Sequence, residues 1–294
     1  MVPAALIAAL CYGAADFFGG LAARRGSVVS VALVAHLAGL LVLVVLGAVT
    51  RGTITVADVA WSCAAGVAGG LSLPLVYRAL ALGNMSLVAP VTGVCMMAFP
   101  VVVALLLGER PSLLQSVGML LATVAIVLVS QKPTAAKHDD AEGMVEVNGP
   151  LTGPATSSRA SALGTAIAAG IVSGVFLVCI SRTSHAAGLW PLAIARLVSL
   201  ALLGAFGAVL RRAILRPLPP VRMAATAGVI DAGGSLFYLV AVRQGALSVS
   251  STLTSLYPAA TVVLARFILR ERTSPVQSVG IAVALLAILC LGTG

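Results

Sequence analysis

The sequence predicts an all-α membrane protein with ten transmembrane helices, arranged as two inverted five-helix repeats. Three observations support this fold class: 60% of the 294 residues are hydrophobic, only 9% are charged, and the second half of the chain repeats the first. A soluble globular domain carries about 25% charged residues, so the composition excludes an ordinary soluble protein. A helix needs roughly 20 apolar residues to cross the hydrocarbon layer. Runs suited to this length lie at 3–22, 28–48, 59–82, 85–107, 113–131, 160–181, 188–210, 223–242, 247–269 and 275–292.

An internal repeat with a constant offset of 162 residues divides the chain. Residues 109–118 return as 271–280, and seven of the ten residues are identical. We therefore expect a first five-helix repeat at 1–131, a polar linker at 132–159 and a second repeat at 160–294. Because five is an odd number, the second repeat enters the membrane from the opposite side. Many transporters are built from inverted repeats of this kind.

The repeated decamer predicts a polar turn followed by a new helix. Ser112-x-x-Gln115 and Ser274-x-x-Gln277 match the capping box, in which Ser accepts from an amide of the first turn and Gln reaches back to the cap. Acidic residues just ahead of a helix are stabilised by the helix dipole. We therefore expect structural roles for two acids in this decamer and its copy, Glu109 and Glu271.

The remaining segments predict few special features. The first apolar run is expected to stay as a span, because it lacks a basic leading region and has the full length of a span. The five cysteines are scattered among the spans, which argues against a disulfide framework and a metal site, and no cofactor is expected. Pro90, Pro100 and Pro258 are expected to kink the fourth and ninth spans. Four of the nine acidic residues lie in the linker, which we expect to be solvated.

The basic residues favour a lipid partner over nucleic acid. The net charge is +9, but the positive side chains gather at the ends of the spans, where phospholipid headgroups lie, and aromatic residues make up only 4% of the chain. In the ten-span topology, thirteen Lys and Arg residues fall on one face and four on the other. By the positive-inside rule, this count predicts that both termini lie outside the cytoplasm.

Four ionisable residues lie deep within predicted spans and are the main candidates for a functional site: Asp16, His36, Arg196 and Asp231. Each such group costs about 2.5–3.5 kcal/mol on insertion scales, so it marks a functional site by default. Asp16 and His36 fall at similar depths, roughly 10–12 Å from the nearer face at 1.5 Å per residue, which allows them to pair. Arg196 and Asp231 fall near the midplane, where repeat-built transporters bind substrate.

Each candidate also has a structural interpretation. His36 could be a satisfied hydrogen-bonding group between helices, and Arg196 could form a purely structural ion pair with Asp231. Asp16 has no acidic counterpart in the second repeat, and a carboxyl group buried there could load and release a proton. Further candidates for lining a cavity are four aromatic residues and one hydroxyl of the Ser- and Thr-rich ninth span: Tyr12, Phe17, Tyr238, Tyr257 and Thr254.

These motifs resemble the drug/metabolite transporter superfamily, specifically proteins with two EamA modules. The resemblance rests on Gly108-Glu109-Arg110-Pro111, on its copy Arg270-Glu271-Arg272 followed by Gln277 and Gly280, and on five spans in each half. It covers the whole chain except the linker. Two departures are Tyr12-Gly13, where the family often has Trp-Gly, and Met96, where the repeat pattern has proline.

The resemblance implies a secondary transporter of the bacterial inner membrane that exports amino acids, metabolites or drugs through a cavity between two helix bundles. It also implies cytoplasmic termini, so the resemblance and the charge count predict opposite orientations. Enzyme motifs and a nucleotide-binding loop are missing from the sequence, so we expect a transporter driven by an ion or solute gradient and not an enzyme.

Two other functions stay open at this stage. One is a passive channel or facilitator, and the other is a membrane protein that transports nothing, such as an intramembrane enzyme or a scaffold. The expected partners are a small-molecule substrate, protons and membrane lipids, with no nucleic acid. The sequence leaves open whether the chain forms a homodimer.

Overall fold

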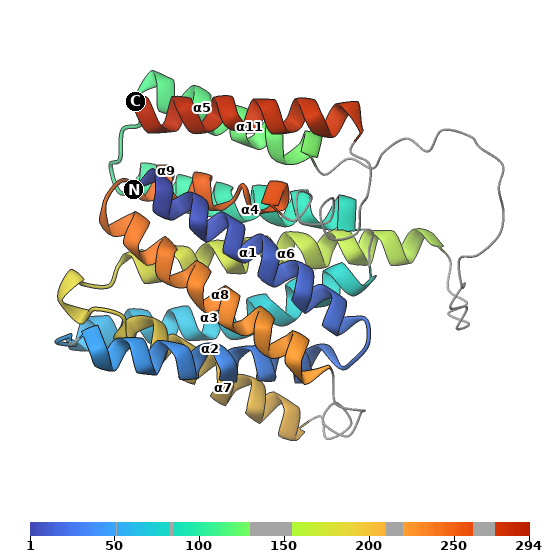
Figure 1. Ribbon diagram of the computed structural model, residues 1–294, viewed down its shortest axis with the longest axis vertical. Helices are drawn as coiled ribbons and strands as arrows, with labels where there is room; N and C mark the ends of the chain where they lie inside the picture. Colours follow the sequence, from blue (N-terminus) through green and yellow to red (C-terminus); the bar gives the residue numbers. More distant parts are fainter. Residues whose placement is uncertain (51, 83–84, 130–154, 210–219, 261–273) are drawn as a thin grey trace.

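The computed structural model describes residues 1–50, 52–82, 85–129, 155–209, 220–260 and 274–294, and all regular secondary structure in these residues is helical (Figure 1). The chain therefore belongs to the predicted all-α class. The helices are α1 (Val2–Ala23), α2 (Val28–Thr50), α3 (Val56–Leu82), α4 (Met85–Leu106), α5 (Leu113–Val129), α6 (Ala155–Ser181), the short 3-10 helix η1 (His185–Ala187), α7 (Trp190–Val209), α8 (Val221–Arg243), α9 (Leu247–Thr254) and α11 (Pro275–Thr293).

Eight of the described helices are long and apolar enough to cross a membrane, and α5 is a shorter apolar helix. These helices lie within a few residues of the predicted spans. The expected linker at 132–159 falls mostly outside the described residues, and its last five residues belong to α6, which begins at Ala155. The chain is therefore a multi-pass membrane protein.

The ninth predicted span, 247–269, is not one continuous helix. Helix α9 ends at Thr254, residues 255 and 256 form a turn, and residues 257–260 are helical again. Pro258 has no N–H to donate to the carbonyl four residues earlier, which belongs to Thr254, so the helix is interrupted there. The rest of this span lies outside the described residues.

Both ends of the chain lie at the same end of the helix bundle, together with the connections α2–α3, α4–α5, α6–α7 and α8–α9 (Figure 1). We call this end the terminal face. The α1–α2 turn lies at the other end, which we call the opposite face (Figure 1). This arrangement agrees with helices that cross the membrane in alternating directions.

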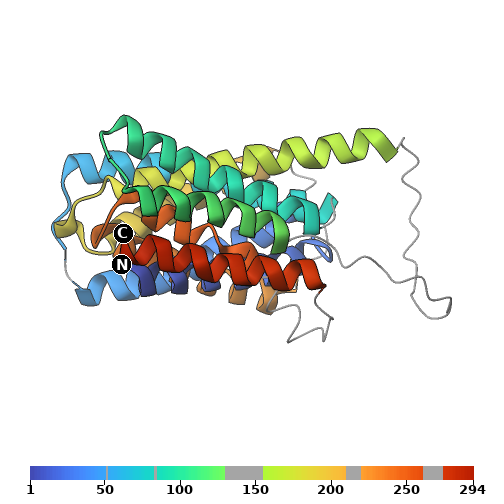
Figure 2. The same ribbon diagram turned by 90° about the horizontal axis from the view of Figure 1, so that it is seen from above.

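Helices from the two halves of the chain are interleaved. Helix α1 packs against α8, α3 packs against α6 and α7, and α2 packs against α7 and α8. Helices α5 and α11 form a pair at one edge of the bundle (Figures 1 and 2). The halves are therefore held together by contacts along many helices. They do not form two separate bundles.

Close packing at one glycine brings the two halves of the chain together. A Cβ atom on Gly66 in α3 would lie 2.6 Å from the carbonyl oxygen of Ala195 in α7. Real Cβ atoms do not approach other atoms so closely, so only glycine allows this contact between backbones. The contact brings α3 against α7 one residue before Arg196.

Gly108 and Glu109 form the C-terminal motif of α4, and the Glu109 side chain then caps a helix of the other half of the chain. Gly108 has a φ of 89°, and its N–H donates to Leu105 O at 3.0 Å, while the N–H of Glu109 donates to Ala104 O at 2.9 Å. This pattern is a Schellman motif, which needs the left-handed conformation that glycine adopts without strain. The Glu109 side chain is thereby directed toward a neighbouring helix.

The carboxylate of Glu109 caps α9, which belongs to the other half of the chain. Its Oε1 accepts from Leu247 N at 2.9 Å and its Oε2 accepts from Ser248 N at 3.1 Å. The sequence predicts that Glu109 stabilises the helix that follows it, α5. Its hydrogen bonds instead stabilise the start of α9, so the role is structural but the helix differs. Glu271, its repeat counterpart, lies outside the described residues.

Both predicted capping boxes are present. Ser112 N donates to Gln115 Oε1 at 3.0 Å, and Gln115 N donates to Ser112 Oγ at 3.1 Å. In the second copy the same two bonds join Ser274 and Gln277, at 3.0 Å and 3.2 Å. The decamer therefore fixes where α5 and α11 begin.

Replacing Glu109 with alanine is expected to destabilise the protein by about 1–2 kcal/mol, because two backbone N–H groups at the start of α9 lose a charged acceptor. Thermal unfolding in detergent measures this effect. The control is Arg110→Ala, which changes the neighbouring exposed side chain. Equal unfolding midpoints for the two variants would contradict a cap across the two halves.

Candidate functional site

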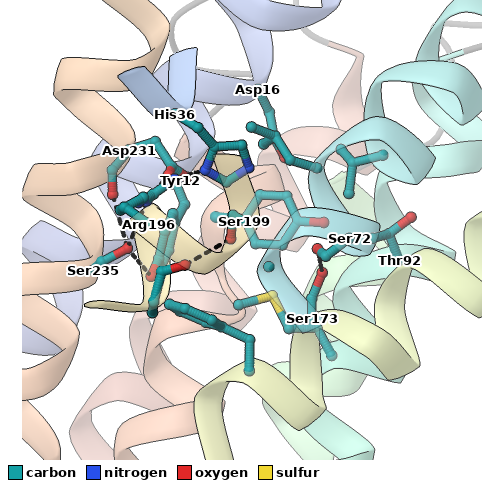
Figure 3. Close-up of a pocket in the computed structure, with 17 residues that line it drawn as sticks. Tyr12, Asp16, His36, Ser72, Thr92, Ser173, Arg196, Ser199, Asp231 and Ser235 are labelled. Atoms are coloured by element: carbon teal, nitrogen blue, oxygen red, sulfur yellow. Dashed lines mark hydrogen bonds and ion pairs between the residues drawn. The ribbon is translucent and has the colours of Figure 1, made fainter. Parts of the chain in front are cut away.

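A cavity lies among helices from both halves of the chain, and the space between its atoms, open solvent included, is about 640 Å³ (Figure 3). Its walls come from α1, α2, α3, α4, α6, α7 and α8, and from the residue that follows the break after α9. The lining residues are Tyr12, Asp16, His36, Gly69, Ser72, Leu73, Val76, Thr92, Met96, Ser173, Phe176, Ala195, Arg196, Ser199, Asp231, Ser235 and Tyr257. All four ionisable candidates from the sequence therefore line one cavity.

Arg196 is the centre of a buried polar network on one side of the cavity (Figure 3). Its guanidinium group forms an ion pair with the Asp231 carboxylate, and this is the only ion pair among the described residues. Nη1 of Arg196 lies 2.9 Å from Nδ1 of His36, and Nη2 donates to Ser235 Oγ at 3.2 Å. His36, Arg196 and Asp231 are only 1%, 5% and 8% exposed, so the network is largely shielded from solvent.

Small residues allow these charged side chains to meet. The network joins His36 of α2, Arg196 of α7 and Asp231 of α8. A Cβ atom on Gly39, one turn after His36, would lie 3.0 Å from the carbonyl oxygen of Gly228 and 3.7 Å from Nε of Arg196. The absence of side chains at these glycines leaves room for the guanidinium group between α2 and α8.

Tyr12 extends the network onto α1. Its hydroxyl donates to Ser235 Oγ at 3.2 Å, and Ser235 in turn donates to the backbone carbonyl of Asp231 at 3.1 Å. Since Ser235 also accepts from Arg196, one serine joins α1, α7 and α8. The spacing of polar residues in α8, with Asp231 and Ser235 one turn apart, would have allowed this serine to be predicted.

Hydroxyl groups form the other side of the cavity, away from the charged network (Figure 3). The Oγ atoms of Ser72 in α3 and Ser173 in α6 lie 2.6 Å apart, and Thr92 in α4 donates to Val88 O at 2.9 Å. Ser199 in α7 donates to the backbone carbonyl of Gly66 at 2.7 Å. The sequence analysis did not select these residues, because single Ser and Thr residues in apolar helices commonly serve only backbone carbonyls.

Asp16 lines the cavity but lies outside the Arg196 network (Figure 3). Its side chain is half-buried, and its carboxylate makes no hydrogen bond or ion pair with another described residue. The Asp16–His36 pair that their depths allow does not form, because His36 contacts Arg196 instead. Asp16 is therefore a carboxylate of the cavity that no described residue bonds.

Tyr12 and Tyr257 line the cavity, whereas three other candidates do not. Phe17 is buried and packs edge-on against Phe18, with ring centroids 5.5 Å apart. Tyr238 is fully buried, and its hydroxyl donates to Leu177 O at 3.0 Å. Thr254 is also fully buried and is not among the lining residues. These three side chains lie on faces of their helices that pack against neighbouring helices.

The cavity combines charged groups and hydroxyl groups. The described residues contain no group of three or more His, Cys, Asp or Glu side chains that could hold a metal ion. The cavity instead offers one cation paired with one anion, a second carboxylate outside that pair, and several hydroxyl groups within apolar walls. This composition matches small-molecule sites, which are mostly apolar with a few polar groups that orient the ligand.

A family model and a solved structure each match nearly the whole length of the chain. The family model of the EamA-like transporter family matches residues 1–131 and 160–293. One solved crystal structure aligns over 98% of this chain and 98% of its own, with a TM-score of 0.66 and 16% sequence identity, so it shares the fold. No curated protein sequence matches the chain.

Proposed function

Since the chain belongs to the EamA-like transporter family, within the drug/metabolite transporter superfamily, we propose that it is a secondary active transporter that exports a small organic solute such as an amino acid, a metabolite or a drug, coupled to protons. Members of this family are membrane transporters and not enzymes. The substrate, the direction and the coupling ion are proposals about this chain.

The cavity with its buried charges is the observation that carries the proposal. Charged residues within spans are costly and are kept where they serve a pathway or a pair. A purely structural ion pair would explain Arg196 and Asp231, but it would not explain Asp16, which lies outside that pair in the same cavity. A cavity that holds a separate carboxylate and an arginine network supports a site that binds solute and proton.

Roles for individual residues follow from their contacts. Nη1 of Arg196 contacts His36, and Nη2 donates hydrogen bonds to Asp231 and Ser235. An anionic group of the solute would therefore compete with Asp231 for the guanidinium group. Asp16 would carry the proton, because its carboxylate has no partner among the described residues. The hydroxyl groups of Ser72 and Ser173 would bind the polar part of the solute that faces away from Arg196.

Contacts between helices support an inverted repeat at 1–131 and 160–294. If each helix is replaced by its repeat counterpart (α1 by α6, α2 by α7, α3 by α8, α4 by α9, α5 by α11), the α1–α8 contact becomes α6–α3 and the α2–α8 contact becomes α7–α3. Both contacts occur. The α2–α7 and α5–α11 contacts are unchanged by the exchange, and they also occur. In such a transporter the halves rock around a central site to give alternating access.

We place the protein in the bacterial inner membrane, where positive charges favour the cytoplasmic face. The thirteen-to-four distribution of Lys and Arg favours a terminal face outside the cytoplasm, whereas the family resemblance implies cytoplasmic termini. A tag on the N-terminus that a protease removes from spheroplasts, but not from inverted membrane vesicles, would support the first orientation, and the reverse result would support the second.

The proposal is tested by transport into liposomes that contain the purified protein. A panel of amino acids, metabolites and organic amines is offered with and without a pH gradient, and solute inside the vesicles is measured by mass spectrometry. We expect the gradient to drive accumulation of at least one class above equilibrium, and a protonophore to remove it. Uptake that only equilibrates would identify a facilitator. A panel without any uptake would favour a protein that transports nothing.

A further inference from the structure

A second polar cluster lies at the terminal face of the bundle, apart from the cavity network. It joins Asp58 in the first turn of α3, Ser184 in the connection between α6 and α7, and Arg243 in the last turn of α8. We call this cluster the Ser184 latch. Asp58 is not among the site residues predicted from the sequence, since charged residues near the end of a span are common.

Ser184 forms hydrogen bonds with the carboxylate of Asp58 and with the guanidinium group of Arg243. Asp58 Oδ1 accepts from Ser184 N at 2.6 Å, and Asp58 Oδ2 accepts from Ser184 Oγ at 3.0 Å. On its other side, the carbonyl oxygen of Ser184 accepts from Nη2 of Arg243 at 2.7 Å. Asp58 and Arg243 do not form an ion pair with each other, so both charges act through the same serine.

Asp58 is bound to its own helix as well as to Ser184. Its Oδ2 accepts from Thr55 N at 2.9 Å and from Thr55 Oγ1 at 2.7 Å, and Asp58 N donates to Thr55 Oγ1 at 3.2 Å. Asp58 is only 2% exposed, so its charge depends on these bonds. Loss of Ser184 would leave the carboxylate half satisfied by the α3 cap, which allows the latch to open without unfolding α3.

The latch joins the helices that enclose the cavity. Helices α3, α6, α7 and α8 all supply lining residues, and the latch connects the ends of these helices at one face only. A second connection, from Thr53 N to Ala186 O at 2.8 Å, fixes the same loop to the segment ahead of α3. The bonds of Asp58 to Ser184 and of Thr53 to Ala186 cross from the first half of the chain to the second, and the Arg243–Ser184 bond fixes the same loop to α8 within the second half. The crossing bonds therefore oppose separation of the halves at the terminal face.

We propose that the Ser184 latch is the gate that closes the cavity toward the terminal face, and that Asp58 and Arg243 must release Ser184 before solute can pass there. This inference rests on the proposed transport function, because alternating access requires the cavity to open to each face in turn. The gate depends on charge-assisted hydrogen bonds, which are stronger than neutral ones but can exchange with water when the loop moves.

The experiment measures access to the cavity from each face. Ser173, which lines the cavity, is replaced by cysteine in a chain whose five native cysteines are changed to alanine. Proteoliposomes of known orientation are treated with a membrane-impermeant maleimide from either side, without solute. Asp58→Asn and Arg243→Gln each weaken one side of the latch. Thr55→Val is the matched control, because it removes the hydroxyl from the α3 cap and keeps the Asp58–Ser184 bonds.

We expect labelling of the Ser173→Cys thiol from the terminal face to rise about tenfold in Asp58→Asn and in Arg243→Gln, because each change removes the charge from a half-buried hydrogen bond of the latch. In Thr55→Val the rate should stay near that of the parent. An unchanged rate in both latch variants, a similar rise in the control, or equal rises from both faces would overturn the gate. Arg243→Gln decides the result if Asp58→Asn does not fold. Labelling needs no transported solute, so failure of the transport assay leaves this test intact.

Discussion

Replacing Arg196 with methionine is expected to lower the free energy of unfolding by about 3–5 kcal/mol and to abolish solute transport. The change leaves the Asp231 carboxylate, which is 8% exposed, without its cation, and a buried charge that loses its partner is strongly destabilising. His36 and Ser235 lose a hydrogen-bond partner in the same step. Thermal unfolding in detergent and uptake into liposomes measure the two effects separately.

The double variant Arg196→Met with Asp231→Asn separates a structural role from a functional one. Removing both charges should restore much of the lost stability, since neither charge is then left unpaired. Transport should remain absent, because the cation that holds the solute is still missing. A double variant that is stable and transports at the wild-type rate would show that the ion pair only holds α7 to α8.

Replacing Asp16 with asparagine is expected to uncouple transport from protons while the protein remains folded. Asparagine has nearly the same shape as aspartate but cannot release a proton in this pH range. Because the Asp16 carboxylate makes no hydrogen bond to a described residue, the unfolding midpoint should stay near that of wild type. Accumulation driven by a pH gradient should disappear, and only solute exchange down its own gradient should remain.

The conservative variant Asp16→Glu is the control for this prediction. It keeps a carboxyl group in the cavity, so coupling should persist at a reduced rate. If asparagine and glutamate at this position both leave coupling at the wild-type level, another group carries the proton, and Asp16 has no part in coupling.

Features that depend on local sequence could be predicted well. Except for the ninth run, which is interrupted after Thr254, the apolar runs predicted the described helices to within a few residues, since a span is defined by its own composition. The Ser-x-x-Gln pattern gave both capping boxes, because all of their bonds lie within four residues. Burying a charge in a membrane is costly, so the ionisable residues within spans could be identified from the sequence as site candidates. These residues, Asp16, His36, Arg196 and Asp231, line one cavity in the structure.

Features that depend on packing between halves could not be predicted from the sequence. Glu109 is followed closely by α5, yet its carboxylate caps α9, which is 138 residues further along the chain. Depth alone suggested that Asp16 and His36 could pair. The rotation of α2, which depends on its packing against α7 and α8, directs His36 to Arg196 instead. Spacing along the chain gives depth, but it does not give the neighbours of a helix.

One part of the Ser184 latch has a local signal in the sequence. Thr55-x-x-Asp58 resembles the capping box, with aspartate in place of glutamate, and it lies at the start of a predicted span. That pattern would have placed Asp58 at a helix N-terminus. Its second set of bonds, to Ser184, depends on where the α6–α7 connection packs, which no local pattern reveals.

The most direct test of proton-coupled transport is the internal pH of proteoliposomes when a solute gradient is imposed and no pH gradient is present. Wild-type protein should produce a pH change that starts with solute movement and scales with the amount moved, and Asp16→Asn should move solute without a pH change. Solute movement with constant internal pH in the wild-type protein would contradict the account. It would identify the protein as a facilitator whose Asp16 has no coupling role.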